Sequence, residues 1–280
     1  MVGNTPLIRI KALCKKFNLP NLYIKDESKN PTGTFKDRKS KAIVGQAYRK
    51  RIKFLMAITT GNFGCSLSKF AKQAGIKTIL FVPKNLKHKM LKTLEKNAIL
   101  IKVDLEKEIL TTAMMKKIAE RHIANNLVKT LNATNIYSDF YDNLFKEIDG
   151  QLKFKAISHI IIPIGSGELF ASAIRHYHGK KTQIIGVAAK SRKTIATMIY
   201  CKYRPVIDNI RKTRKYKNYR IVYLPENQIK KIYNFMKSKI SCEPSAAAAF
   251  AVLEILKFNP DGRVLVINTG NGLKNFHSSQ

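Results

Sequence analysis

Lys36 lies in a segment whose composition favours chemical reactivity. It follows residues 31–35, a turn-forming stretch that contains a glycine, and it stands at the predicted start of a helix. A free lysine is protonated near neutral pH and reacts poorly, but desolvation and neighbouring cations lower its pKa. Arg38 is one such cation. By composition alone Lys36 would be one of many surface lysines, so a Schiff-base role depends on the rest of the chain.

Two glycine-containing turns each follow a predicted strand and precede a predicted helix. Their residues are Thr59, Thr60, Gly61, Asn62 and Phe63 in the first turn, and Gly165, Ser166, Gly167, Glu168 and Leu169 in the second. Such turns present backbone N–H groups and the positive end of a helix, which suits a carboxylate or a phosphate. Alone, each turn is more often a plain connection. The negative charge of Glu168 is unfavourable beside a phosphate, so we expect its carboxylate to point away from the turn.

A third glycine turn follows the predicted strand 263–268 and begins with Thr269 and Gly270. Further upstream, Glu243 and Pro244 precede a run of alanines. Proline in the first turn followed by alanines is also typical of an ordinary tightly packed helix, and we expect Glu243 to be a neighbour of the site.

Short β-rich apolar runs alternate with amphipathic segments, which is typical of parallel strands connected by helices. The predicted strands are residues 54–60, 77–83, 99–104, 159–164, 183–188 and 263–268. Leu91 and Leu94 share one predicted apolar helix face, and Met114 and Ile118 share another. The basic run 207–220 is predicted to be an exposed loop. A chain of 280 residues can form two lobes or one large α/β domain.

The chain is strongly basic, with 52 Lys and Arg against 18 Asp and Glu and a formal net charge of +34. These cations are scattered through nearly every predicted element, as on a solvated surface, and no recognised nucleic-acid motif accompanies them. The four cysteines are widely spaced, so neither a zinc site nor a disulfide scaffold is indicated. No apolar run reaches membrane-spanning length. We therefore expect a soluble, cytoplasmic protein that binds neither nucleic acid nor membranes.

Taken together and in order, these segments resemble motifs of the threonine synthase branch of the fold-type II pyridoxal-phosphate enzymes. The similar segments are residues 3–7, 26–38, 59–64, 165–169, 241–249 and 269–274. The resemblance implies that pyridoxal 5'-phosphate forms a Schiff base with Lys36, beside Phe35. It also implies that Asn62 contacts the ring oxygen, that Thr269 meets the ring nitrogen and that Gly165 to Leu169 bind the phosphate. The turn of Thr59 to Phe63 would bind the substrate carboxylate.

The same resemblance implies the fold. We expect an α/β protein of the tryptophan synthase β-like type, with two lobes that each contain a mainly parallel sheet flanked by helices. Residues 1–39 and 146–280 would form the larger, cofactor-binding lobe, and residues 40–145 the smaller, mobile one. Relatives are commonly homodimers, which we expect here as well.

The implied reaction is the conversion of O-phosphohomoserine to threonine and phosphate. In many threonine synthases an arginine pairs with the substrate phosphate, but the corresponding residues 135–142 contain no arginine and include Asp139 and Asp142. An alternative is therefore β-replacement or β-elimination on another amino acid, as in cysteate synthase, cysteine synthase or dehydratase relatives. A second alternative is a catalytically idle binding protein, because the family's opening motif is commonly preceded by residues that this chain lacks.

Overall fold

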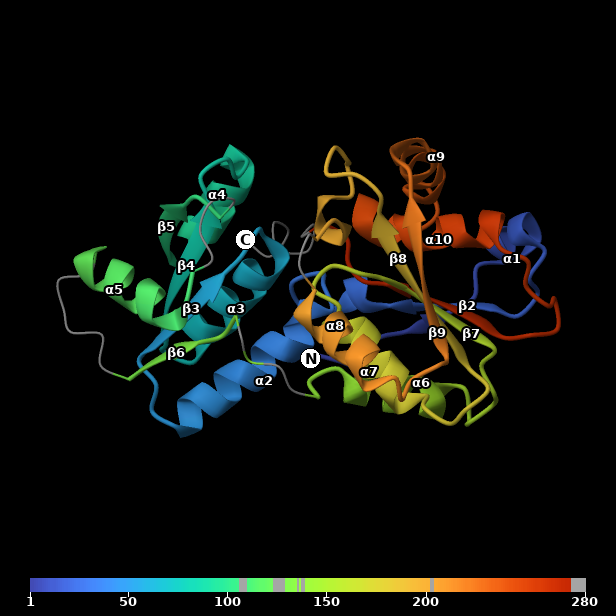
Figure 1. Ribbon diagram of the computed structural model, residues 1–280, viewed down its shortest axis with the longest axis horizontal. Coiled ribbons are helices and arrows are strands. Elements are labelled where there is room, and N and C mark those ends of the chain that lie inside the picture. The colour runs from blue at the N-terminus through green and yellow to red at the C-terminus, as the bar shows by residue number, and fades with distance from the viewer. Residues whose placement is uncertain (106–109, 123–128, 135, 137–138, 202–203, 273–280) are drawn as a thin grey trace. The chain divides into compact units, whose positions relative to one another are not determined.

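The computed structural model describes residues 1–105, 110–122, 129–134, 136, 139–201 and 204–272 (Figure 1). The chain forms two compact units. The larger one combines Met1–Phe35 with Tyr141–Gln280, and the smaller one is Lys36–Phe140. The larger unit is therefore built from two stretches of chain that are far apart in the sequence.

A six-stranded sheet forms the centre of the larger unit. Its strands lie in the order β1 (Leu7–Ile8), β2 (Leu22–Asp26), β10 (Val264–Asn268), β7 (His159–Pro163), β8 (Gln183–Ala189) and β9 (Tyr219–Leu224). The β1 strand runs antiparallel to β2, and the other neighbours are parallel. Because parallel strands point the same way, the turns that follow β7 and β10 leave the sheet at the same edge.

Helices cover both faces of this sheet, as Figure 1 shows. The helices on one face are α1 (Lys11–Phe17), α9 (Glu226–Met236) and α10 (Pro244–Ile255), and those on the other are α6 (Asp142–Gln151), α7 (Glu168–His176) and α8 (Pro205–Thr213). Two short 3₁₀ helices, η1 (Glu27–Lys29) and η2 (Thr197–Ile199), lie in loops. Alternate strand residues enter opposite cores: Ile161 packs with α10, whereas Ile160 and Ile162 pack with α7.

The smaller unit contains a four-stranded parallel sheet. Its strands lie in the order β5 (Ile99–Val103), β4 (Lys77–Pro83), β3 (Phe54–Ile58) and β6 (Thr130–Asn132). Its helices are α2 (Lys36–Arg49), α3 (Asn62–Gln73), α4 (His88–Glu95) and α5 (Thr112–His122). Both units thus have mainly parallel sheets flanked by helices, which confirms the expected fold class.

Two local predictions from the sequence were wrong. The α5 helix buries Met115 fully and leaves Met114 39% exposed, so its apolar face is displaced by one residue from the predicted stripe. The basic run 207–220 contains most of α8 and the start of β9 rather than an exposed loop. Ile207 and Ile210, one helical turn apart, are buried there because α8 packs its apolar side against the sheet.

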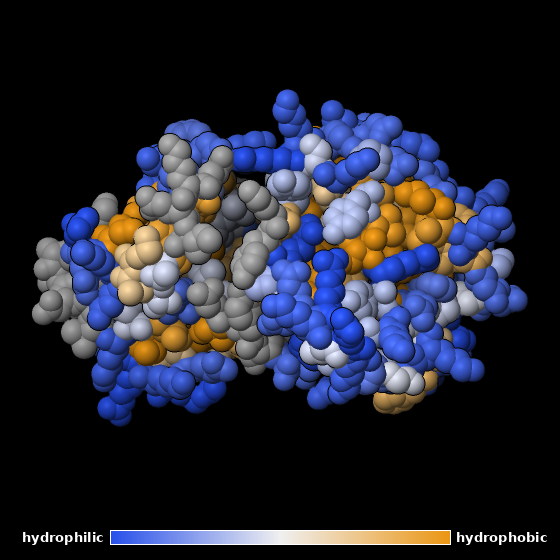
Figure 2. Space-filling view, in the orientation of Figure 1, coloured by the Kyte–Doolittle hydropathy of each residue, from blue (hydrophilic) through white to orange (hydrophobic). Residues whose placement is uncertain are grey.

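Hydrophilic side chains are spread over both units on the face shown in Figure 2, which agrees with the scattered distribution of basic residues in the sequence. Within the described residues, no helix has both the length and the apolar character needed to cross a membrane.

Candidate active site

Lys36 is the first residue of α2, and the residue before it is tied to the C-terminal turn. The backbone N–H of Phe35 donates to the carbonyl of Thr269 at 3.0 Å. Thr34 forms a β-bridge with Gly270, and the N–H of Asn271 donates to Gly33 at 3.0 Å. The structure therefore brings together two of the residues singled out from the sequence, Phe35 and Thr269.

Glycine is required where these two segments meet. Gly33 has a φ of +78°, and a Cβ at this position would lie 2.3 Å from Oδ1 of Asn271. A Cβ on Gly270 would lie 2.9 Å from the carbonyl oxygen of Gly33. Larger residues would separate the two segments and so move the chain that leads into Lys36.

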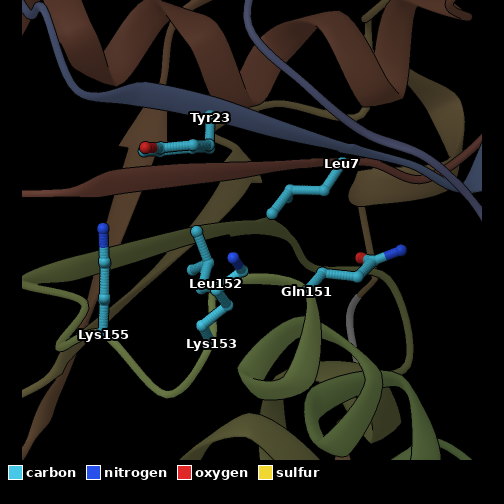
Figure 3. A pocket seen from close by; sticks show the side chains of 6 residues that line it. All are labelled: Leu7, Tyr23, Gln151, Leu152, Lys153 and Lys155. Carbon is cyan, nitrogen blue, oxygen red and sulfur yellow. The ribbon is translucent and has the colours of Figure 1, made fainter.

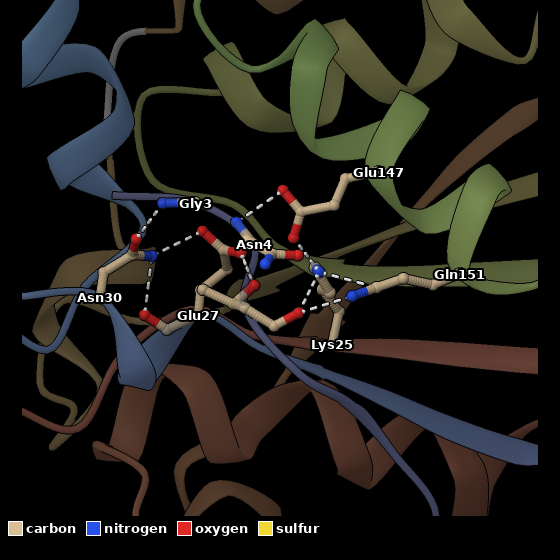
Figure 4. Close-up of polar contacts among 8 residues, drawn as sticks. Gly3, Asn4, Lys25, Glu27, Asn30, Glu147 and Gln151 are labelled. Atoms are coloured by element: carbon tan, nitrogen blue, oxygen red, sulfur yellow. Dashed lines mark hydrogen bonds and ion pairs between the residues drawn. The ribbon is translucent and has the colours of Figure 1, made fainter. Parts of the chain in front are cut away.

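A buried polar network holds the start of this loop (Figure 4). Asn30 donates to the Glu27 carboxylate at 2.8 Å and accepts from the N–H of Gly3 at 3.0 Å. Glu27 also accepts from the Thr5 hydroxyl at 2.5 Å. Glu27 and Asn30 are fully buried, so these bonds are shielded from water. The N-terminal residues thus fix the loop that carries Lys36, which the sequence indicated only through a family-like opening.

The second glycine turn lies at the carboxyl end of β7, where α7 begins. Gly167 is the N-cap residue of α7 and has a φ of +92°. The first N–H groups of a helix lack intrahelical partners, so this end favours an anion. The Ser166 hydroxyl donates to Oε1 of Glu168 at 3.3 Å. This rotamer places the carboxylate beside the serine expected to bind a phosphate, whereas we expected it to point away.

The first glycine turn, in the smaller unit, is organised by one hydroxyl. Oγ1 of Thr59 accepts from the N–H of Gly61 at 3.1 Å and from that of Gly64 at 2.9 Å. Thr59 is buried, whereas Thr60 is exposed. Asn62 is the first residue of α3. Thr59 therefore shapes the turn, and Thr60 and Asn62 are the side chains that it presents.

Within the smaller unit, the start of α2 is bonded to the start of α3. The Ser66 hydroxyl donates to Oδ1 of Asp37 at 2.6 Å, and both residues are fully buried. Nζ of Lys39 lies 5.1 Å from the centre of the Phe63 ring, and Lys39 is only 2% exposed. Lys36 and Lys39 are three residues apart and so share one helix face. Lys39 therefore places a cation beside the first glycine turn, on the same helix face as Lys36.

Cys65, which follows this turn, is not a nucleophile. Burial raises the pKa of its thiol to about 12, so it stays protonated at neutral pH. Its sulfur lies against Met90 at 3.9 Å, as expected of a core residue.

A separate pocket of the larger unit is drawn in Figure 3. It has a volume of about 440 Å³ and is lined by Leu7, Tyr23, Gln151, Leu152, Lys153 and Lys155. Apart from Leu7, which belongs to the family-like segment 3–7, none of these residues lies in a segment that the sequence singled out, and we assign the pocket no role in the reaction.

Comparison with known proteins gives consistent family relationships. A threonine synthase of Methanocaldococcus jannaschii is 26% identical over 312 aligned positions, which cover 97% of this chain and 75% of that protein. A cystathionine beta-synthase of Saccharomyces cerevisiae is 30% identical over 210 positions, which cover 66% of this chain and 40% of that protein. The solved O-acetylserine dependent cystathionine beta-synthase from Helicobacter pylori has a TM-score of 0.79 at 20% identity and covers 100% of this chain and 96% of its own. The similarity to this solved structure shows the fold of the chain.

The second glycine turn fits a phosphate-bearing cofactor. A Cβ on Gly165 would lie 2.5 Å from the carbonyl oxygen of Met198, and one on Gly167 would lie 2.6 Å from Ile207. Only glycine lets this backbone pack so closely, and N–H groups at the start of a helix favour an anion. The family model for pyridoxal-phosphate dependent enzymes matches residues 1–270. The chain therefore belongs to the family of pyridoxal-phosphate-dependent enzymes and uses this cofactor.

Proposed function

We propose that the protein is a lyase of the threonine synthase type, which converts O-phosphohomoserine to threonine and phosphate. The observation that carries the proposal is the hydrogen bond from Phe35 to Thr269. This bond joins the segment that ends in Lys36 to the C-terminal turn. In that turn a threonine, Thr269, rather than an acidic residue, is expected at the ring nitrogen of the cofactor. Similarity to a threonine synthase along 97% of the chain supports the same assignment.

When bound, pyridoxal phosphate supplies an electron sink for the carbanion that remains after an amino acid loses its α-proton. Lys36 would hold the cofactor covalently through its ε-nitrogen. When not bonded to the cofactor, its ε-amine would accept the α-proton of the substrate. One residue thus serves as both anchor and base.

Thr269 determines which reactions are favoured. Its hydroxyl, unlike a carboxylate, does not stabilise a protonated pyridine nitrogen. The electron sink is then weaker, so elimination and replacement are favoured over transamination.

The first glycine turn is proposed to bind the substrate carboxylate. Thr60 and the N–H groups at the start of α3 would donate to it, while Thr59 keeps the turn in shape. Asn62 would contact the ring oxygen of the cofactor. The buried cation of Lys39, beside Phe63 in this turn, suits a substrate that carries a second anionic group.

A second candidate is β-replacement on a serine-type substrate. It is favoured by the absence of arginine from residues 135–142, of which residues 135, 137 and 138 lie outside the described part of the chain. The similarity to a cystathionine beta-synthase over 66% of the chain also supports it.

The first test uses the visible absorbance band of the lysine-bound cofactor. We expect this band in wild-type protein saturated with pyridoxal phosphate and in Lys41→Ala, which changes an exposed lysine of the same helix. We expect its loss in Lys36→Ala. A wild-type protein without the band would contradict both catalytic candidates and favour the idle binding protein.

The second test decides between the substrates. Wild-type protein is incubated with O-phosphohomoserine and assayed for threonine and inorganic phosphate. In parallel it is incubated with O-acetylserine and either sulfide or homocysteine, and assayed for the thioether or thiol product. Threonine release supports the leading proposal, whereas turnover of O-acetylserine alone would replace it with β-replacement.

A further inference from the structure

Three residues, Met198, Arg204 and Ile207, pack against the second glycine turn. Nε of Arg204 donates to the carbonyl of Gly165 at 3.2 Å. The carbonyl of Met198 lies where a Cβ of Gly165 would be, and Ile207 lies where a Cβ of Gly167 would be. All of these residues belong to the larger unit. These three residues therefore support the backbone of the turn.

Met198 is linked to the C-terminal turn through the start of α10. The N–H of Met198 donates to the Ser245 hydroxyl at 3.2 Å, and Ser245 lies in the first turn of α10. The N–H of Glu243, the N-cap residue of α10, donates to the carbonyl of Gly270 at 2.9 Å. A continuous path of bonds thus joins the turn expected at the cofactor ring nitrogen to the turn expected at its phosphate.

The Arg204 guanidinium fixes the orientation of one peptide group. A second nitrogen of this side chain, Nη2, donates to the carbonyl of Ile199 at 3.4 Å, so two bonds hold the planar group. In a trans peptide the carbonyl and the following N–H point in opposite directions. When Arg204 holds the carbonyl of Gly165, the N–H of Ser166 is directed away from Arg204.

We infer that Arg204 is a positioning residue for the cofactor phosphate. It orients the Gly165–Ser166 peptide so that the Ser166 N–H serves as a donor, and it places a positive charge behind the turn that receives a dianion. The inference rests on the proposed phosphate-binding role of this turn. It adds a residue that no sequence motif indicated, because the partner of Arg204 is a backbone carbonyl 39 positions away.

The test measures binding of pyridoxal phosphate to cofactor-free protein. We expect Arg204→Met to raise the Kd on the order of tenfold, as for the loss of one charge-assisted hydrogen bond. The ³¹P resonance of the bound cofactor should also shift, because the donors around the phosphate change. The matched control is Arg211→Met, which alters a half-exposed arginine of α8 paired with Asp208 at 3.8 Å. It should change neither quantity.

Arg204→Gln and Arg204→Lys separate positioning from folding. Glutamine retains a neutral donor and lysine retains the charge, so both should fall between wild type and Arg204→Met, with lysine nearer to wild type. Thermal unfolding of each cofactor-free variant reports whether it is folded. The inference would be overturned if folded Arg204→Met showed the wild-type Kd and an unshifted ³¹P resonance. If the methionine variant does not fold, the same result in Arg204→Gln would overturn it.

These measurements require no substrate. If the wild-type protein binds the cofactor normally but turns over no amino acid, the proposed function is contradicted. An altered Kd for pyridoxal phosphate in Arg204→Met would still support the inference about Arg204. A wild-type protein that binds no pyridoxal phosphate would overturn both.

Discussion

At the second glycine turn, where we propose that the cofactor phosphate binds, Glu168 combines a favourable and an unfavourable effect. A carboxylate in the first turn of a helix stabilises that helix through the helix dipole. The same carboxylate accepts a hydrogen bond from Ser166 at 3.3 Å, and it repels any dianion bound at this turn. The residue therefore supports α7 while weakening the anion site at its N-terminus.

We expect Glu168→Gln to bind pyridoxal phosphate a few-fold more tightly than wild type, because like-charge repulsion is removed while a similar side chain remains. The difference should shrink as salt is added, since screening weakens the repulsion. Titration of cofactor-free protein at two salt concentrations measures this. Glu226→Gln, at the first residue of α9, is the matched control. Weaker binding in Glu168→Gln would show instead that the carboxylate orients Ser166 for the cofactor.

Among the helices, α6 and α7 are joined by a cluster around Asp149. Its carboxylate contacts Nε2 of His176 at 2.9 Å, accepts from the Tyr177 hydroxyl at 2.7 Å and pairs with Lys180 at 3.3 Å. Burial favours the neutral form of Asp149, but the hydrogen bonds from His176 and Tyr177 and the charge of Lys180 outweigh it and lower its pKa. Burial, together with Asp149, raises the pKa of Tyr177, which stays a neutral donor. Because α7 begins at the second glycine turn, this cluster anchors the helix that follows the proposed phosphate site.

Asp149→Asn should lower the free energy of unfolding at neutral pH by about 1–3 kcal/mol, because buried donors lose a charged acceptor. The pKa of Asp149 is lower in the folded protein, so its contribution is present above the ordinary value of 3.8 and is lost as the pH falls below it. Urea unfolding across this range should show the two proteins converging in acid. Asp208→Asn, in an exposed pair, is the control and should change little. A pH-independent difference would contradict the electrostatic explanation.

At the scale of the whole molecule, the larger unit must join two separate stretches of chain, and Lys25 connects them. Its side chain is fully buried. It donates to the carbonyl of Thr5 at 2.6 Å, from the first stretch, and to Gln151 at 2.9 Å and the Glu147 carboxylate, from the second. Figure 4 shows this convergence beside the Glu27 and Asn30 network that holds the start of the Lys36 loop. Stability of the unit and placement of the loop are therefore linked.

Lys25→Met should lower the free energy of unfolding by about 3–5 kcal/mol, because it leaves the partly buried Glu147 carboxylate without its cation. Adding Glu147→Gln should recover part of this loss, since the unpaired charge is then removed. Chemical unfolding of both single variants and the double variant gives the coupling. Lys231→Met, in an exposed pair with Glu254, is the control. Additive losses in the double variant would show that the pair is not coupled.

The sequence predicted most of the central parallel strands, because long apolar runs are a local signal. The bounds of β4 were predicted correctly, and those of β7, β8 and β10 were within one residue. It did not predict β1, β2, β6 or β9. The β1 and β6 strands have only two and three residues, and charged residues interrupt the apolar pattern of β2 and β9. The sequence displaced the apolar face of α5 by one residue, since burial of Met115 depends on which neighbours the helix meets.

By itself, the sequence determined the family-like segments, because glycine turns and motif order are properties of residue type and spacing, and the resemblance that these segments carry implied the fold class and the cofactor. Only the tertiary structure decided that Phe35 is bonded to Thr269, that Thr59 shapes the first turn, and that Arg204 supports the second. These contacts join residues through backbone groups that every residue possesses. Residue type cannot reveal them, and the fold alone selects which carbonyl or N–H a side chain reaches.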